Sequence, residues 1–155
     1  MTENKTPIPP QLGEWLSRNR LKIELILTVP ALVFYFTVNN QEILMVTMTT
    51  LAAFYFLSAY IKVDVEEMFG LIALKVVNIS CAVCVLSLLF KTLALEGAQH
   101  MMLVGSLSIA SGVLIILAMW VKSQNRNYLP FLIRALILGF ITGWVFLPEI
   151  REMMA

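Results

Sequence analysis

Five long apolar segments, separated by short polar connections, constrain this chain more than any other feature. A helix of about 20 apolar residues, rising ~1.5 Å per residue, matches the ~30 Å hydrocarbon core of a bilayer. Lipid offers backbone groups no hydrogen-bond partner, so each such segment must be helical. The segments are Ile23–Val38, Ile43–Ile61, Met68–Phe90, Met101–Val121 and Tyr128–Leu147. They predict an all-α, polytopic membrane protein.

The composition agrees with a lipid environment. Of the 155 residues, 59% are hydrophobic and 14% are charged, whereas soluble domains are about 45–50% apolar and about 25% charged. A soluble domain of this length could not bury so much apolar surface, so the lipid bilayer is the first predicted partner. The net charge of +1 lacks the basic excess of nucleic-acid-binding proteins, and no nucleic acid is predicted.

The connections are too short to hold a separate domain and force neighbouring helices to run antiparallel, which predicts an up-down bundle of five transmembrane helices. In that arrangement seven basic residues flank the spans on one side and two on the other. The first side would carry Lys5, Arg18, Arg20, Lys22, Lys62, Lys122 and Arg126, and the second Lys91 and Arg151. Because cytoplasmic connections are enriched in Lys and Arg, we predict a cytoplasmic N-terminus and an external C-terminus.

We divide the chain into a polar leader (1–22), a transmembrane domain (23–147) and a short tail (148–155). The leader lacks the pattern of a cleaved secretory signal, so the first apolar segment is expected to be retained as an anchor. Residues 11–22 suit either a helix lying at the membrane surface or an ordinary polar leader. The first segment is short and contains Glu24 and Pro30; if it does not cross, four spans remain.

Three charged residues fall inside the spans: Glu24, Lys75 and Arg134. Their spans run in the same direction, so the three lie at similar depth near the inner face and form a predicted intramembrane charge cluster. Such charges usually face the bundle interior and pair; Glu24 is the expected partner of Arg134 or Lys75, with acidic residues of the 62–67 connection as further candidates. The alternatives are snorkelling, in which long side chains extend toward the headgroups, or a proton or ion pathway.

Small residues three or four positions apart, on one face of a helix, predict helix-packing seams, because they let two helix backbones approach closely. One seam is in the fourth segment and the other in the fifth. Their residues are Gly105, Ser108 and Gly112, and Ala135, Gly139 and Gly143. The packing partner could be a helix of the same chain or of another protein.

The third segment carries polar positions Asn78, Ser80 and Ser87, of which Asn78 needs a hydrogen-bond partner at that depth. It also carries Cys81 and Cys84. A structural zinc site needs about four ligands, so we interpret the two thiols as small packing residues. We predict no metal, no cofactor and no catalytic residue.

Three hypotheses for function follow. The first is a small non-enzymatic subunit or scaffold that packs with other membrane proteins or with itself. The second is an oligomeric transporter or channel component for a small solute or ion, which would use the charge cluster and the polar positions. The third is an integral membrane enzyme, which would depend on Glu96 and His100 in the connection after the third segment.

A stretch of about 40 residues around this connection resembles the transmembrane hairpin of gliding-motility membrane proteins of the GldL type, and of similar small bacterial multi-pass membrane proteins. The resemblance is carried by Leu89–Lys91, then Gly97–Ala98, then Met102–Gly105, with Leu93–Glu96 in place of the family's aromatic corner. It implies a helical hairpin in a bacterial inner membrane. The spans contain no acidic residue at mid-membrane depth to match a motor role in that family.

Overall fold

The computed structural model describes residues 10–37, 40–61, 68–124 and 126–154, and this part of the chain is helical. It contains five α-helices and one short 3₁₀ helix. These are α1 (Pro10–Thr37), α2 (Gln41–Ser58), α3 (Met68–Thr92), α4 (Ala98–Ser123), η1 (Arg126–Tyr128) and α5 (Leu129–Met154). Residues 1–9 of the predicted leader and the 62–67 connection, with its candidate acidic partners, lie outside the described residues.

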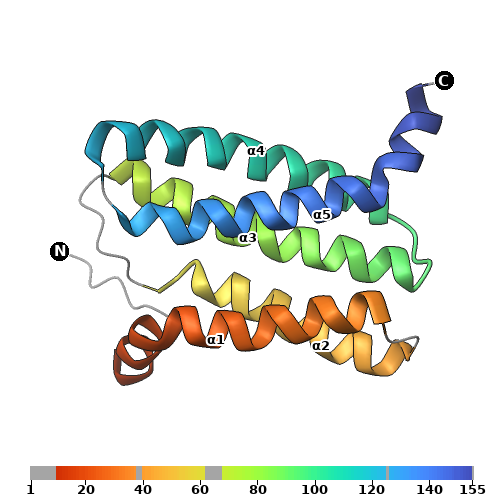
Figure 1. The fold of residues 1–155 in the computed structure, drawn as a ribbon, viewed down its shortest axis with the longest axis horizontal. Helices are drawn as coiled ribbons and strands as arrows, with labels where there is room; N and C mark the ends of the chain where they lie inside the picture. The colour runs from red at the N-terminus through yellow and green to blue at the C-terminus, as the bar shows by residue number, and fades with distance from the viewer. Residues whose placement is uncertain (1–9, 38–39, 62–67, 125, 155) are drawn as a thin grey trace.

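The helices form a bundle in which α1 and α2 lie together along one side of α3, α4 and α5 (Figure 1). Helix α3 is central, because it packs against α2, α4 and α5, whereas α1 packs mainly on α2. The short connections set consecutive helices antiparallel, so α1, α3 and α5 run in one direction. The cytoplasmic end that we predict for these three helices is therefore a single end of the bundle.

The core lies along α3. Val77 and Cys81 of this helix are fully buried in one cluster with residues of α2 and α4 such as Tyr55 and Ile116. Leu88 is fully buried in a second, smaller cluster with residues of α4 and α5. Helix α3 therefore needs apolar or small residues around most of its circumference. This requirement explains why its sequence is a nearly continuous apolar run rather than an amphipathic one.

Four helices are long and apolar enough to cross a membrane: α2, α3, α4 (Ala98–Lys122) and α5 (Leu129–Pro148). Their outer faces are apolar as well, with Leu107, Leu114, Phe140 and Trp144 each more than two-thirds exposed. Soluble monomers rarely expose apolar patches larger than a few hundred Å², so this surface is suited to lipid. The described part of the chain is thus all-helical, with four helices suited to cross a membrane.

Helix α1 is not among these four, although we predicted a span within it. Charged residues recur through its first half, up to Glu24, so its uncharged stretch within the helix is only Leu25–Thr37. That stretch is about 20 Å long at ~1.5 Å per residue, short of the ~30 Å hydrocarbon core. A span by α1 therefore depends on what neutralises Glu24.

The ends of several helices have local causes. Asn40 caps α2, because its side-chain oxygen accepts hydrogen bonds from the backbone N–H groups of Glu42 and Ile43. Gly97, with a φ of 87°, turns the chain into α4 through a conformation that suits glycine. Pro148 lies inside α5 and lacks the N–H that would continue the helical bonding. The last turns of α5 bend away from the bundle (Figure 1).

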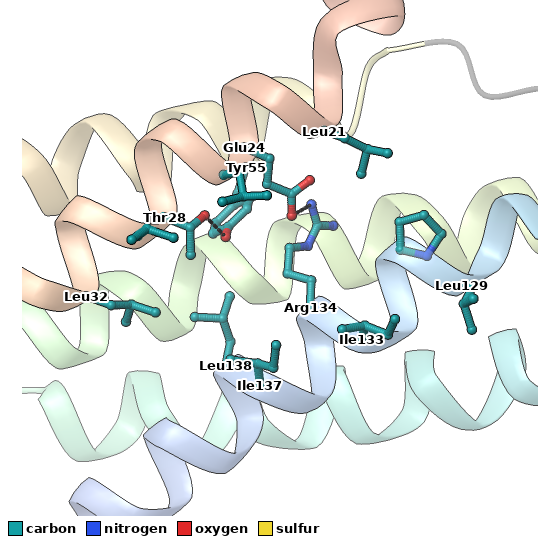
Figure 2. Close-up of a pocket in the computed structure, with 13 residues that line it drawn as sticks. Leu21, Glu24, Thr28, Leu32, Tyr55, Leu129, Ile133, Arg134, Ile137 and Leu138 are labelled. Atoms are coloured by element: carbon teal, nitrogen blue, oxygen red, sulfur yellow. Dashed lines mark hydrogen bonds and ion pairs between the residues drawn. The ribbon is translucent and has the colours of Figure 1, made fainter.

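Helix α1 is continuous across the boundary predicted between leader and membrane domain at residue 22. Its first turns bend away from the axis of the remainder, near Leu21 (Figures 1 and 2). Trp15 in this bent part is exposed. Residues 11–22 are thus helical, and their place at the membrane surface stays a prediction.

Candidate functional site

The most unusual feature of the bundle is a buried arginine. Arg134, in the second turn of α5, is only 7% exposed. Its Nη1 donates a hydrogen bond to Oε1 of Glu24 on α1, at 3.1 Å, and the two groups form an ion pair. Its Nη2 donates to Oδ1 of Asn78 on α3. One guanidinium group thus joins three helices that are far apart in the sequence.

Asn78 is the centre of this polar group. Its Oδ1 also accepts a hydrogen bond from Nη2 of Arg20 on α1, at 3.2 Å. Its Nδ2 lies 3.5 Å from the carbonyl oxygen of Ser58, at the end of α2. An amide side chain suits this place because it offers both an acceptor and donors. Among the described residues, Arg20, Glu24, Asn78 and Arg134 form what we call the polar junction.

Aromatic rings pack against the guanidinium groups of Arg20 and Arg134. The Cζ atom of Arg20 lies 4.1 Å from the centre of the Phe131 ring, and that of Arg134 lies 5.3 Å from the same ring and 4.8 Å from the Tyr55 ring. Such cation–π contacts contribute about 0.5–2 kcal/mol each. The Tyr55 hydroxyl group in turn bonds with Thr28 of α1, at 2.8 Å.

The polar junction carries an excess of positive charge. Burial, and then the nearby charge of Arg134, lower the pKa of Arg20 to about 10, so this side chain is protonated at neutral pH. Arg134 is likewise a permanent cation, since arginine side chains stay protonated in proteins. Two cations therefore share the single carboxylate of Glu24, which leaves one positive charge unbalanced within the junction.

A cleft of about 490 Å³ opens beside the polar junction, between α1 and α5. One wall runs along α1 from Leu21 to Leu32 and the other along α5 from Leu129 to Leu138, with Tyr55 at the base. Figure 2 shows Arg134 rising from α5 toward Glu24 across this space. The remaining lining is almost entirely aliphatic, so the cleft is an apolar groove with charged groups at one point.

The sequence-predicted charge cluster is placed only in part as expected. The structure brings Glu24 and Arg134 together, but the side chain of Lys75 is exposed, next to the exposed Val76. The buried faces of α3 at this level belong to Leu74 and Val77. Lys75 therefore points away from the core, as the snorkelling alternative describes.

Arg20, and not Lys75, is the second cation of the polar junction. Sequence reasoning counted it among the basic residues flanking the first span. Its spacing of four residues from Glu24 was the available signal, because side chains at i and i+4 lie on the same face of a helix. A carboxylate that faces the bundle interior thus implies an interior position for Arg20 as well.

The other polar positions of α3 are buried and bonded. Ser80 donates to the carbonyl oxygen of Val76, at 2.8 Å, and Ser87 to that of Cys84, at 2.7 Å. These bonds stay within the helix, as is usual for serine in apolar helices. Of the three predicted positions, only Asn78 reaches other helices through its side chain.

The α4 seam packs against α3 of the same chain. A Cβ atom at Gly112 would lie 2.4 Å from Cγ2 of Val77, and one at Gly105 would lie 2.9 Å from Sγ of Cys84. Ser108, between them, is half-buried. The absence of side chains at the two glycines is therefore what lets α4 approach α3.

The α5 seam is more open. Ala135 is fully buried, whereas a Cβ atom at Gly139 would meet only Ile109 of α4, at 3.7 Å, and one at Gly143 would meet nothing within 4 Å. Phe140 and Trp144 are exposed beside Gly143, with stacked rings. The seam thus begins inside the bundle and ends on its surface.

The last turn of α3 makes a contact with α5 that sequence reasoning did not anticipate. Lys91 Nζ donates a hydrogen bond to the carbonyl oxygen of Val145, at 2.6 Å, and lies 4.4 Å from the centre of the Phe146 ring. Glu96, in the α3–α4 connection, and His100, in the first turn of α4, are the two residues of the enzyme hypothesis, and both are exposed. Within the described ranges, no three acidic, histidine or cysteine side chains gather as a metal site would require.

Comparison of the chain with protein-family models, with curated proteins and with solved structures found no match.

Proposed function

We propose that this chain is a five-span protein of a bacterial inner membrane, and that it serves as a non-enzymatic subunit or scaffold that packs with other membrane helices. Its N-terminus is cytoplasmic and its C-terminus external. The observation that carries the proposal is the polar junction, in which the ionised groups within the bundle bond to neighbouring helices of the same chain.

The same junction supports a fifth span by α1. Pairing with Arg134 removes the isolated negative charge of Glu24, so the segment available to hydrocarbon extends back to about Leu21. Leu21–Thr37 is about 25 Å long at ~1.5 Å per residue, a length that a bilayer accommodates by slight thinning or by snorkelling of Lys22. Helix α1 then crosses as what we call a dependent span, a span that needs the pairing of Glu24 with Arg134 to enter the bilayer.

The scaffold function is favoured over transport by how the polar side chains are used. Asn78 lies in the polar junction, and Ser80 and Ser87 bond to their own helix. These groups stabilise the packing of helices and do not form a row of open hydrogen-bonding sites. The alternative, an oligomeric transporter or channel component, is favoured by one observation: Glu24 and Arg134 border a cleft.

The surface end of the α5 seam is the place where another membrane helix would pack. Gly143 leaves the backbone accessible beside the exposed, stacked rings of Phe140 and Trp144. Small residues on a lipid-facing surface allow close approach of a second helix, which favours association by packing within the bilayer. The occupant would be a helix of another membrane protein or of a second copy.

The test is purification from the native membrane in polymer-bounded lipid discs, followed by native mass spectrometry. We expect a stoichiometric complex with the wild-type chain, with loss of the bound subunit in Gly143→Leu and retention in the control Leu114→Phe, which changes an exposed position of α4. A monomer for all three chains would contradict the scaffold proposal. Solute flux through proteoliposomes of the purified monomer would favour the transport alternative instead.

A further inference from the structure

The cleft between α1 and α5 has the form of a site for a molecule with an acidic head and an apolar tail. Its two walls, on α1 and α5, run in the same direction, from the predicted cytoplasmic end of the bundle inward. The α1 wall, Leu21 to Leu32, is about 16 Å long at ~1.5 Å per residue. Ligand cavities are typically about 300–1,000 Å³, so a cleft of about 490 Å³ is of suitable size.

The charged part of the cleft lies toward its cytoplasmic end. Glu24 lies about one helical turn after Leu21, where the α1 wall begins. Arg134 lies little more than one turn after Leu129, where the α5 wall begins. Arg20 lies a turn before Glu24 and joins the same junction through Asn78. Beyond these residues the walls are aliphatic toward the middle of the predicted span, except for Thr28, whose hydroxyl group bonds with that of Tyr55. Polar and apolar parts are thus ordered as in a phospholipid of the inner leaflet.

Among the described residues, the junction also has one cation more than it has anions. Two guanidinium groups share one carboxylate and one amide oxygen, and the Nε atom of the buried Arg134 has no hydrogen-bond partner among the described residues. Leaving a buried donor unsatisfied destabilises the fold, and more so when the donor is charged. An anion entering the cleft would balance the excess positive charge.

We propose that the α1–α5 cleft binds one anionic phospholipid, with its phosphate beside Arg134 at the polar junction, where the charge of Arg20 adds to the attraction, and an acyl chain between the two walls. Basic pockets between transmembrane helices on the cytoplasmic side are suited to acidic lipid headgroups. The occupant would connect α1 to α5, which face each other across the cleft. Lipid composition would thereby control how firmly the dependent span is held.

The experiment is native mass spectrometry of the delipidated full chain with equal amounts of phosphatidylglycerol and phosphatidylcholine, matched in acyl chains. Each basic residue near a membrane surface contributes about 1 kcal/mol toward acidic lipid, a factor of about five in affinity. We therefore expect the wild-type chain to favour phosphatidylglycerol at least fivefold. Arg20→Gln should lower this preference about fivefold, whereas Arg20→Lys, which keeps the charge, should retain most of it.

Two further variants test charge and shape separately. Asn78→Asp has the same shape but adds the missing negative charge within the junction, so it should abolish the preference while keeping the fold. Val29→Trp fills the α1 wall and should reduce binding of both lipids, whereas the control Leu114→Trp, on the exposed face of α4, should leave binding unchanged. Circular dichroism and thermal unfolding without added lipid verify that each variant is folded.

Three results would overturn the proposal. The first is equal retention of the two lipids by the wild-type chain. The second is unchanged preference in folded Asn78→Asp or unchanged binding in folded Val29→Trp. The third is binding of soluble glycerol phosphate to the same extent as phosphatidylglycerol. That result would place an anion but no acyl chain in the cleft. A dimer that Val29→Trp disrupts would show instead that a second copy fills it.

Discussion

Replacing Gly112 by alanine tests the packing of α4 on α3 most sharply. The added Cβ atom would lie 2.4 Å from Cγ2 of Val77, whereas carbon atoms in contact are about 3.5–4.0 Å apart. Val77 is fully buried, and a valine in a helix has one strongly preferred χ1 rotamer. The clash therefore requires the two helices to separate or Val77 to adopt a strained rotamer.

The expected cost follows from the size of this clash. Inserting a methyl group into a well-packed core typically destabilises a protein by about 1–3 kcal/mol. Replacing glycine by alanine in a helix also contributes up to about 1 kcal/mol in the opposite direction. Gly143→Ala is the matched control, because its Cβ atom would meet nothing within 4 Å. The difference between the two variants isolates the steric cost, about 1–3 kcal/mol.

The assay can use the two cysteines, which are free and buried. A thiol-reactive fluorogenic dye in mild detergent reports thermal unfolding, and we expect Gly112→Ala to melt several degrees below Gly143→Ala. Val77→Ala should relieve the clash, so the double variant should show a coupling of about 1–3 kcal/mol, as contacting residues do. Equal melting temperatures for the two glycine variants would refute the close α3–α4 packing.

The remaining predictions use the same assay. Arg134→Gln should destabilise the protein by about 3–5 kcal/mol, because it leaves the Glu24 carboxylate buried without its partner, whereas Lys75→Gln should change stability by less than about 0.5 kcal/mol, as surface substitutions do. Comparable losses for the two variants would contradict the burial of Arg134. Tyr55→Phe should cost about 0.5–1.5 kcal/mol through the lost hydroxyl bond to α1, and Tyr60→Phe, at an exposed position, close to nothing. A Tyr55→Phe variant as stable as the wild type would argue against the docking of α1 on α2.

The helices of this fold are largely predictable from the sequence, because long apolar runs leave the backbone no alternative in lipid. The predicted segments from residue 43 onward coincide in position with α2 to α5. The first helix was harder to delimit. Charge and turn-forming residues suggest a boundary at residue 22, yet α1 continues through it, since Arg20 and Glu24 both have partners within the bundle.

The polar junction was predictable only in part. Shared depth identified Glu24 as a partner for Arg134, because depth follows from position along a span. Depth does not specify which face of α3 is buried, and this face decides that Asn78 enters the junction and Lys75 does not. Side chains of α3 are buried around most of its circumference, so its apolar pattern carries little information about orientation.

The direct test of the five-span account is the accessibility of single cysteines in a chain that lacks Cys81 and Cys84. An impermeant maleimide applied to intact spheroplasts should label cysteines at positions 40, 96 and 151, which lie at the predicted external ends of the helices. It should not label positions 18 and 124 unless the membrane is opened. Equal labelling at positions 18 and 40, on either side of α1, would show that α1 does not cross and would contradict the account.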